Sequence, residues 1–196
     1  MNSRDAILTA LRRNAPPVSP LPEAPTAIAY ENPDAQFAET FRSVGGTLIR
    51  LPSLVALDAE LRSLEFYRQA HKIVSLVSGV GASTVDVSAM KQPHELEGVE
   101  LAIIAGEFGV AENGAVWVPG SSLGPQRAIF VIAEHLALIL PAGQIVHTMQ
   151  HAYQRLRFER PGFGVFISGP SKTADIEQSL VIGAHGPRRC TLFLVG

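Results

Sequence analysis

A glutamate followed by a turn pair stands near the middle of the chain, where Glu112, Asn113 and Gly114 precede the apolar run 115–118. An Asn-Gly pair in this position is a strong signal for a β-hairpin. A carboxylate held at such a turn could attack an activated acyl group as a nucleophile, contact a ligand, or only stabilise the turn. The residues leave these three roles open, with Glu112 as the candidate for covalent catalysis and its two neighbours as candidates for binding.

A loop of small polar residues follows the apolar run 165–167, which predicts a buried strand. Loops after buried strands are common ligand sites in α/β proteins. We expect a helix to begin at Ala174, with Asp175 and Glu177 in its first turn, so that free amides, hydroxyls and a lysine surround a phosphate or carboxylate. The alternative is that the hydroxyls only cap the helix. The loop's candidate binding residues are Ser168, Gly169, Pro170, Ser171, Lys172 and Thr173.

Two histidines and an arginine extend this candidate site. His135 directly precedes an apolar run, where it could act as an acid–base group or ligand contact, or make a structural hydrogen bond at a strand end. His185 and Gly186 form a turn that we expect near the polar loop. Arg127 could bind a substrate carboxylate through two parallel hydrogen bonds, or lie solvated on the surface.

The elements that must position these residues alternate along the chain between strand-like and helix-like segments. Continuous apolar strands indicate burial on both faces, and their alternation with helices indicates a largely parallel sheet. We therefore predict one α/β domain over residues 33–196. The expected strands are 47–51, 72–77, 101–105, 115–118, 136–140, 165–168 and 191–195. The expected helices are 3–13, 33–44, 54–66 and 145–158.

Residues 1–32 form a separate N-terminal region, a short amphipathic helix followed by a proline-rich arm. Ser3 is the expected helix N-cap, and Ile7, Leu8 and Leu11 share one face. We expect this apolar face to dock on the chain's own domain, with a partner protein as the alternative. The arm is extended because its prolines forbid regular helix. These prolines are Pro16, Pro17, Pro20, Pro22 and Pro25.

Composition narrows the class of protein. The chain has 196 residues, 46% of them hydrophobic and 17% charged, and its net charge of −2 argues against nucleic acid or an anionic membrane as the main partner. No apolar run reaches the roughly 18 residues of a transmembrane helix, so we expect a cytoplasmic protein. Cys190 is the only cysteine, which excludes an internal disulfide and a cluster held by this chain's own thiolates. His147 and His151 lack a third ligand, and we predict no metal site.

The stretch 164–187 reads GVFISGPSKTADIEQSLVIGAHGP and resembles the GPS-[RK]-TADIE…HGP signature of the LUD family, the lactate-utilisation domain, most of all its lactate utilisation protein C members. The resemblance includes an AE-[TN]-G stretch at Glu112 and a histidine at the start of a strand, here His135. It implies the Rossmann-like fold shared with ribose-5-phosphate isomerase, glucosamine-6-phosphate deaminase and class I CoA transferases. In those transferases the glutamate of a Glu-Asn-Gly motif becomes an acyl thioester, which the resemblance suggests for Glu112.

The resemblance also implies a function in bacterial L-lactate utilisation. The chain would be a subunit that supports the oxidation of L-lactate to pyruvate beside two iron–sulfur partner proteins, which carry the electrons while this chain holds no cofactor. A small carboxylate or phosphate is the ligand expected in its loops. Two alternatives stay open: a stand-alone enzyme that transforms an acyl-CoA or a sugar phosphate with Glu112, and a non-catalytic interaction module that docks through the N-terminal helix.

Overall fold

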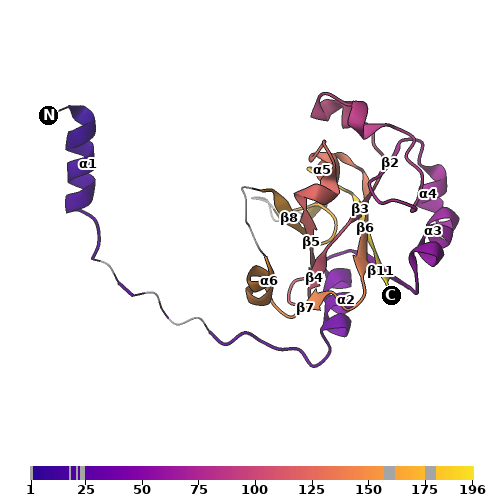
Figure 1. Cartoon of the computed structure of the whole chain (residues 1–196), viewed down its shortest axis with the longest axis horizontal. Helices are drawn as coiled ribbons and strands as arrows, with labels where there is room; N and C mark the ends of the chain where they lie inside the picture. Colours follow the sequence, from indigo (N-terminus) through magenta and orange to yellow (C-terminus); the bar gives the residue numbers. More distant parts are fainter. Residues whose placement is uncertain (1, 18, 21, 23–24, 157–161, 175–179) are drawn as a thin grey trace.

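The computed structural model describes residues 2–17, 19–20, 22, 25–156, 162–174 and 180–196. Its centre is a parallel sheet in which five strands follow the order β1-β11-β6-β3-β2 (Figure 1). This confirms the predicted α/β class with a parallel central sheet. The strands are β1 (Thr47–Leu51), β2 (Ile73–Ser75), β3 (Leu101–Ala105), β6 (His135–Pro141) and β11 (Arg189–Val195).

A second sheet, in the order β7-β4-β5-β8, packs against one face of the central sheet. Strands β4 and β7 run parallel in it, and the other neighbours are antiparallel. The prediction of one largely parallel sheet is wrong for the runs 115–118 and 165–168, which pair with each other here. A short hairpin at Asn113 leads into the first of them, and so short a connection can join only antiparallel strands. The strands are β4 (Phe108–Val110), β5 (Ala115–Pro119), β7 (Ile145–Val146) and β8 (Gly164–Ile167).

Two of the predicted helices are broken or shortened in the structure. The segment 54–66 forms α3 and α4, which meet at Leu64, where the backbone is extended with ψ 137°. The segment 145–158 begins as strand β7, so its helix starts only at Met149. The helices are α1 (Ser3–Arg13), α2 (Pro33–Ser43), α3 (Leu54–Ser63), α4 (Glu65–Gln69), α5 (Ile129–Ile132) and α6 (Met149–Arg155), with 3-10 turns at Val87–Ala89, Pro93–Leu96 and Gly120–Leu123.

Hydrophobic side chains cover both faces of the central sheet. On one face, Leu57 and Leu61 of α3 pack against alternate residues of the strands, among them Ile103. On the other face, Phe37 of α2 packs with side chains of the second sheet and of α5. Helix α6 covers the outer face of the second sheet through Ala152. The layers therefore run from α3 and α4 through the parallel sheet to the second sheet and α6, which leaves the amino and carboxyl edges of the central strands as places for a site.

Helix α1 lies at the end of an extended arm, apart from the domain (Figure 1). None of its residues is buried, and Ile7 and Leu11 are 60% and 62% exposed. The prediction that its apolar face docks on its own domain is therefore wrong. Asn2 caps the helix in place of Ser3, since its side-chain oxygen accepts the backbone N–H of Asp5. The division of the chain at residue 32 stays a prediction. None of the described helices is long and apolar enough to cross a membrane.

Candidate functional site

Two adjoining hollows lie at the amino ends of the central strands, beside α4, and we call them together the amino-edge groove. Their volumes are about 640 and 350 Å³. Both halves are lined by Leu64, Phe66, His135, Arg188 and Arg189. The larger half continues to Glu65, Glu100 and Glu134. The smaller half continues to Gly45, Thr47, Ile49, Cys190 and Thr191.

His135 is a buried polar residue of the groove, with 7% of its surface exposed. It is the first residue of β6 and stands opposite Arg189 on β11, on the face of the sheet that α4 covers. Its Nε2 lies 2.8 Å from the hydroxyl of Thr191, and its ring centre lies 4.0 Å from that of Phe66. Burial and the nearby charge of Arg189 lower the pKa of His135 to about 4. The imidazole is therefore neutral at pH 7 and serves as a hydrogen-bonding group.

Two neighbouring arginines give the groove its positive charge. The backbone amides of Arg188 and Arg189 donate to the carbonyl of Glu134, at 2.8 and 3.3 Å, which fixes both residues where β11 begins. Both side chains are exposed and line both halves of the groove. Within the described part of the chain, neither guanidinium forms an ion pair. Sequence reasoning missed this pair. The signal was present, since both arginines directly follow the turn at His185 and precede an apolar strand.

The predicted polar loop reaches the end of the groove next to β1. The hydroxyl of Ser168 donates to the carbonyl of Asn113 at 2.7 Å, which joins the loop to the glutamate turn. The side chains of Pro170 and Lys172 pack beside Gly45, a residue that lines the smaller half of the groove. The structure thus brings together several residues that sequence reasoning predicted as one site.

A second set of contacts joins this loop to the turn before β11. The backbone N–H of Ser171 donates to the carbonyl of Pro187 at 2.8 Å. Gly186 packs so closely on the side chain of Ser171 that a Cβ at Gly186 would lie 2.9 Å from it. His185, the neighbour of Gly186, is exposed. These contacts place the loop, this turn and the two groove arginines in one continuous surface.

The helix predicted to begin at Ala174 is wrong for the residues that the structure describes. Strand β9 (Lys172–Ala174) pairs antiparallel with β10 (Leu180–Ile182), and Thr173 lies opposite Val181. β-Branched residues in both segments favour strands. No helix start therefore offers free amides at 172–174, which removes the basis for an anion site there. Asp175 and Glu177 lie outside the described residues.

The Glu112 carboxylate has a structural partner. Its Oε2 accepts the backbone N–H of Met149, the first residue of α6, at 2.8 Å. The backbone N–H of Glu112 also donates to the carbonyl of His147 at 3.0 Å. A carboxylate at this end of a helix satisfies a free amide and favours the helix dipole. The geometry therefore assigns Glu112 to holding α6 against the hairpin, while its role as a nucleophile stays a prediction.

The side chain of Arg127 lies away from the other predicted site residues. Its guanidinium stacks over the ring of Phe163, with 5.2 Å to the ring centre. Phe163 precedes Gly164, which pairs with Pro119 at one end of the β5–β8 ladder, whereas Ser168 follows the other end. The structure therefore separates Arg127 from the polar loop.

The two histidines at 147 and 151 take part in local hydrogen bonds. Nδ1 of His147 accepts the backbone N–H of Tyr30 at 3.0 Å, and Nδ1 of His151 lies 2.9 Å from the hydroxyl of Thr148. His147 precedes α6, so the expectation that both share one helix is wrong. No group of three metal-ligating side chains gathers within the described ranges.

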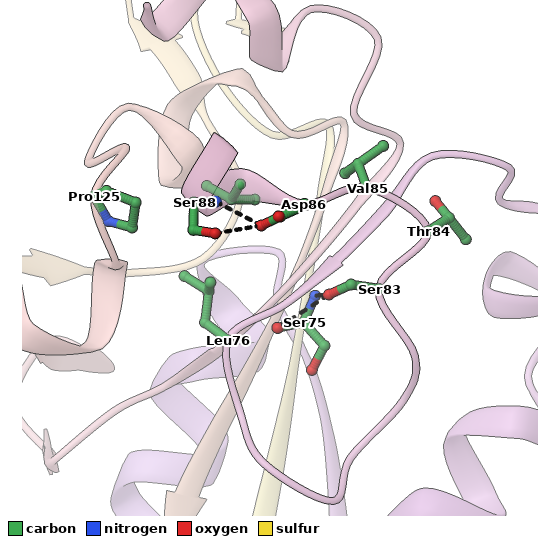
Figure 2. A pocket seen from close by; sticks show the side chains of 9 residues that line it. Ser75, Leu76, Ser83, Thr84, Val85, Asp86, Ser88 and Pro125 are labelled. Atoms are coloured by element: carbon green, nitrogen blue, oxygen red, sulfur yellow. Dashed lines mark hydrogen bonds between the residues drawn. The ribbon is translucent and has the colours of Figure 1, made fainter. Parts of the chain in front are cut away.

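A further hollow of about 490 Å³ lies at the carboxyl end of β2 (Figure 2). Parallel α/β sheets commonly bind ligands at this edge. Its hydroxyls are engaged in the fold, however. Ser83 accepts the N–H of Ser75 at 2.8 Å, Thr84 accepts the N–H of Ile73 at 2.8 Å, and Asp86 accepts the hydroxyl of Ser88 at 2.6 Å. The amino-edge groove, whose exposed guanidinium groups have no ion-pair partner among the described residues, is the better candidate site.

The stretch 164–187 predicts membership in the LUD family. The LUD domain family matches residues 56–195, and the chain belongs to this family. Lactate utilization protein C from Exiguobacterium sp. is 32% identical over 185 residues, which are 83% of this chain and 79% of that protein. Proteins of the same name from Shouchella clausii and Halalkalibacterium halodurans are 33% and 32% identical, over 52% of this chain. The matched part spans only 46% of the length of each of these two relatives.

A solved structure shares the fold. The crystal structure of a DUF162 family protein from Deinococcus radiodurans superposes with a TM-score of 0.57 over 83% of this chain and 95% of that one. Its sequence identity is 18%, so this likeness concerns the fold alone.

Proposed function

We propose that the chain is a subunit of a bacterial L-lactate utilisation system and supports the oxidation of L-lactate to pyruvate together with iron–sulfur partner proteins. The observation that carries this proposal is the match to lactate utilization protein C from Exiguobacterium sp. along most of both chains. The proposal includes a cytoplasmic location and the finer fold assignment, in which the central sheet is that of ribose-5-phosphate isomerase and the class I CoA transferases.

The proposed division of labour follows from the chain's thiol chemistry. Oxidation of a secondary alcohol to a ketone releases two electrons and two protons, which an acceptor must take up. An iron–sulfur cluster is normally held by four cysteine thiolates. The chain has one cysteine, Cys190, which is 2% exposed, and burial raises its pKa to about 12. This chain therefore does not fit a cluster of its own, and the proposal assigns the electrons to the partners.

The groove side chains suit binding more than proton abstraction. An imidazole with a pKa of about 4, such as that of His135, is a weak base at neutral pH. The guanidinium groups of Arg188 and Arg189 stay charged and can receive a carboxylate. We therefore assign to this chain the positioning of an acidic substrate or partner segment, and to its partners the redox step.

Co-purification tests the proposal. The full chain, tagged in its native host and grown on L-lactate, is recovered and assayed for iron, labile sulfide and cysteine-rich proteins. The expected eluate contains all three. A matched strain with Cys190→Ala should retain the same iron content, because the clusters belong to the partners. Recovery of the chain alone and free of iron, together with unimpaired growth of a deletion strain on L-lactate, would contradict the proposal.

A further inference from the structure

We propose that the smaller half of the amino-edge groove binds a short-chain 2-hydroxy or 2-oxo acid, with the acid's carboxylate on the arginine pair. This deepens the proposed function and rests on it for the inclusion of lactate among the candidate acids. Three kinds of side chain line this hollow of about 350 Å³: cations, hydrogen-bonding groups and apolar walls.

The arginine pair provides the anchor for the carboxylate. Arg189 begins β11 directly opposite His135, and the backbone amides of both arginines are fixed on the carbonyl of Glu134. The planar fork of a guanidinium matches a carboxylate with two parallel hydrogen bonds. Within the described residues, neither guanidinium is paired with a carboxylate, and both side chains are exposed in the groove.

The hydrogen-bonding groups suit an oxygen on carbon 2. Thr47, Thr191 and His135 line the same hollow, and the last two are linked at 2.8 Å. A neutral imidazole has one donor and one acceptor nitrogen, and a hydroxyl can serve in both ways. This set can therefore accommodate a hydroxyl group or an oxo group.

The apolar walls suit a hydrocarbon tail. Ile49, Leu64 and Phe66 line this half of the groove, and the ring of Phe66 packs at a tilt against the imidazole. The volume of about 350 Å³ lies at the lower end of the range of small-molecule sites, about 300 to 1,000 Å³. It exceeds what a three-carbon acid fills, so acids with longer tails should bind at least as well as lactate.

Carboxylates in the other half of the groove fix the ligand's orientation. Glu65, Glu100 and Glu134 line the larger half, where they would repel an acid group. Glu100 is held in place because its Oε2 accepts the backbone N–H of Lys72 at 2.9 Å. The acid's carboxylate therefore belongs in the smaller half, which the same two arginines also line.

Ligand titrations of the purified full chain test this assignment. L-lactate, pyruvate, 2-hydroxy-4-methylpentanoate, propionate and inorganic phosphate are titrated by calorimetry, with the NMR shifts of the His135 ring as a local readout. We expect the 2-substituted acids to bind and to shift this ring, the longer acid to bind no more weakly than lactate, and propionate to bind more weakly.

Arginine variants make the test specific. Arg189→Gln should raise the Kd for the acids about tenfold or more, because it removes a charge-assisted hydrogen bond. Arg189→Lys keeps the charge without the fork and should give an intermediate Kd. Arg127→Gln is the matched control, since this arginine stacks on Phe163 away from the groove, and should leave the Kd unchanged. Melting curves check that each variant is folded.

Three results would overturn the assignment: no binding of any acid, acid binding that Arg189→Gln leaves unchanged, or binding of phosphate alone. Failure here is distinguishable from failure of the proposed function. A chain that co-purifies with iron–sulfur proteins but binds none of these acids would retain its role as a subunit and lose this ligand site.

Discussion

The Nε2 of His135 lies 2.8 Å from the hydroxyl oxygen of Thr191, diagonally across the neighbouring strands β6 and β11. Both side chains are on the face that α4 covers, and both are nearly inaccessible to solvent. The contact joins two central strands at their amino ends. It also gives a buried imidazole a neutral partner in a place where the positive charge of Arg189 disfavours protonation.

The buried imidazole predicts a loss of stability in mild acid. The pKa of His135 falls from its ordinary 6.5 to about 4 in the folded chain because of burial and Arg189. Its stabilising contribution is therefore complete above pH 6.5 and is lost as the pH falls from 6.5 towards 4. The free energy of unfolding should decrease by up to about 3 kcal/mol from this group over that window, as measured by urea unfolding.

His135→Gln is the control for this pH dependence. Glutamine can still hydrogen-bond Thr191 but does not titrate, so the variant should show a flatter pH dependence between pH 6.5 and 4. An unchanged slope would assign the acid sensitivity to other groups.

The contact between Glu112 and Met149 predicts a stability effect at the hairpin. Glu112→Ala removes the acceptor of the first amide of α6 and should lower the free energy of unfolding by about 1 kcal/mol. Glu112→Gln keeps an acceptor and should lose less. Hydrogen exchange of the Met149 amide should quicken in the alanine variant alone. Equal stability of both variants and the wild type, with loss of L-lactate growth in both, would instead support the nucleophile hypothesis.

Gly114 should tolerate no side chain. Its φ is 64°, and a Cβ there would lie 2.9 Å from the backbone of Phe41 in α2. Gly114→Ala combines left-handed strain with a clash and should cost about 3 kcal/mol of unfolding free energy. Gly143→Ala is the matched control, since its φ is 75° but nothing lies within 4 Å of its Cβ position, and it should cost about 1 kcal/mol. Equal losses in urea unfolding would mean that α2 yields to the added methyl group.

Cys190 should be unreactive in the folded chain. Its side chain is 2% exposed and its pKa is raised to about 12 by burial, so little thiolate forms at pH 8. Alkylation by iodoacetamide, followed by mass spectrometry, should be slow in the native state and fast in urea. Rapid alkylation of the native chain would show that the amino end of β11 opens readily.

Removal of residues 1–14 should leave the domain's stability unchanged. No residue of α1 is buried, so the midpoint of urea unfolding should move by less than the equivalent of about 0.5 kcal/mol. Phe41→Ala is the positive control, since Phe41 is fully buried in the core and its loss should cost about 3 to 5 kcal/mol. A clear loss of stability on truncation would indicate that α1 packs on the domain in solution.

Sequence patterns predicted the central strands well, because β3, β6 and β11 are continuous apolar runs that only a sheet covered on both faces can bury. The hairpin at Asn113 was equally predictable from turn chemistry. The sequence patterns did not predict which of the two sheets each strand joins. An apolar run such as 115–118 has the same pattern in a parallel or an antiparallel pairing, and long-range pairing decides between them.

The site was predicted only in part, for physical reasons. The small polar residues of the loop are recognisable in sequence, but their packing on Gly45 and Pro187 arises from contacts between distant segments. Local propensity favoured a helix at Ala174, and pairing with β10 prevailed. Arg188 and Arg189 look like ordinary surface charges until the parallel register places Arg189 opposite His135, with Arg188 beside it in the groove.

Ser83 and Thr84 hydrogen-bond along the outer border of β2, and this has a consequence for self-association. The outward N–H and C=O groups of Ile73 and Ser75 are taken by Ser83 and Thr84, so this border of the central sheet presents no free ladder to another chain. Exposed borders of sheets are the usual starting points for strand addition and fibrillar aggregation. The hydroxyls of Ser83 and Thr84, which line the hollow in Figure 2, thus occupy the backbone groups that another strand would need. Copies of this chain therefore cannot join by extending the sheet at β2.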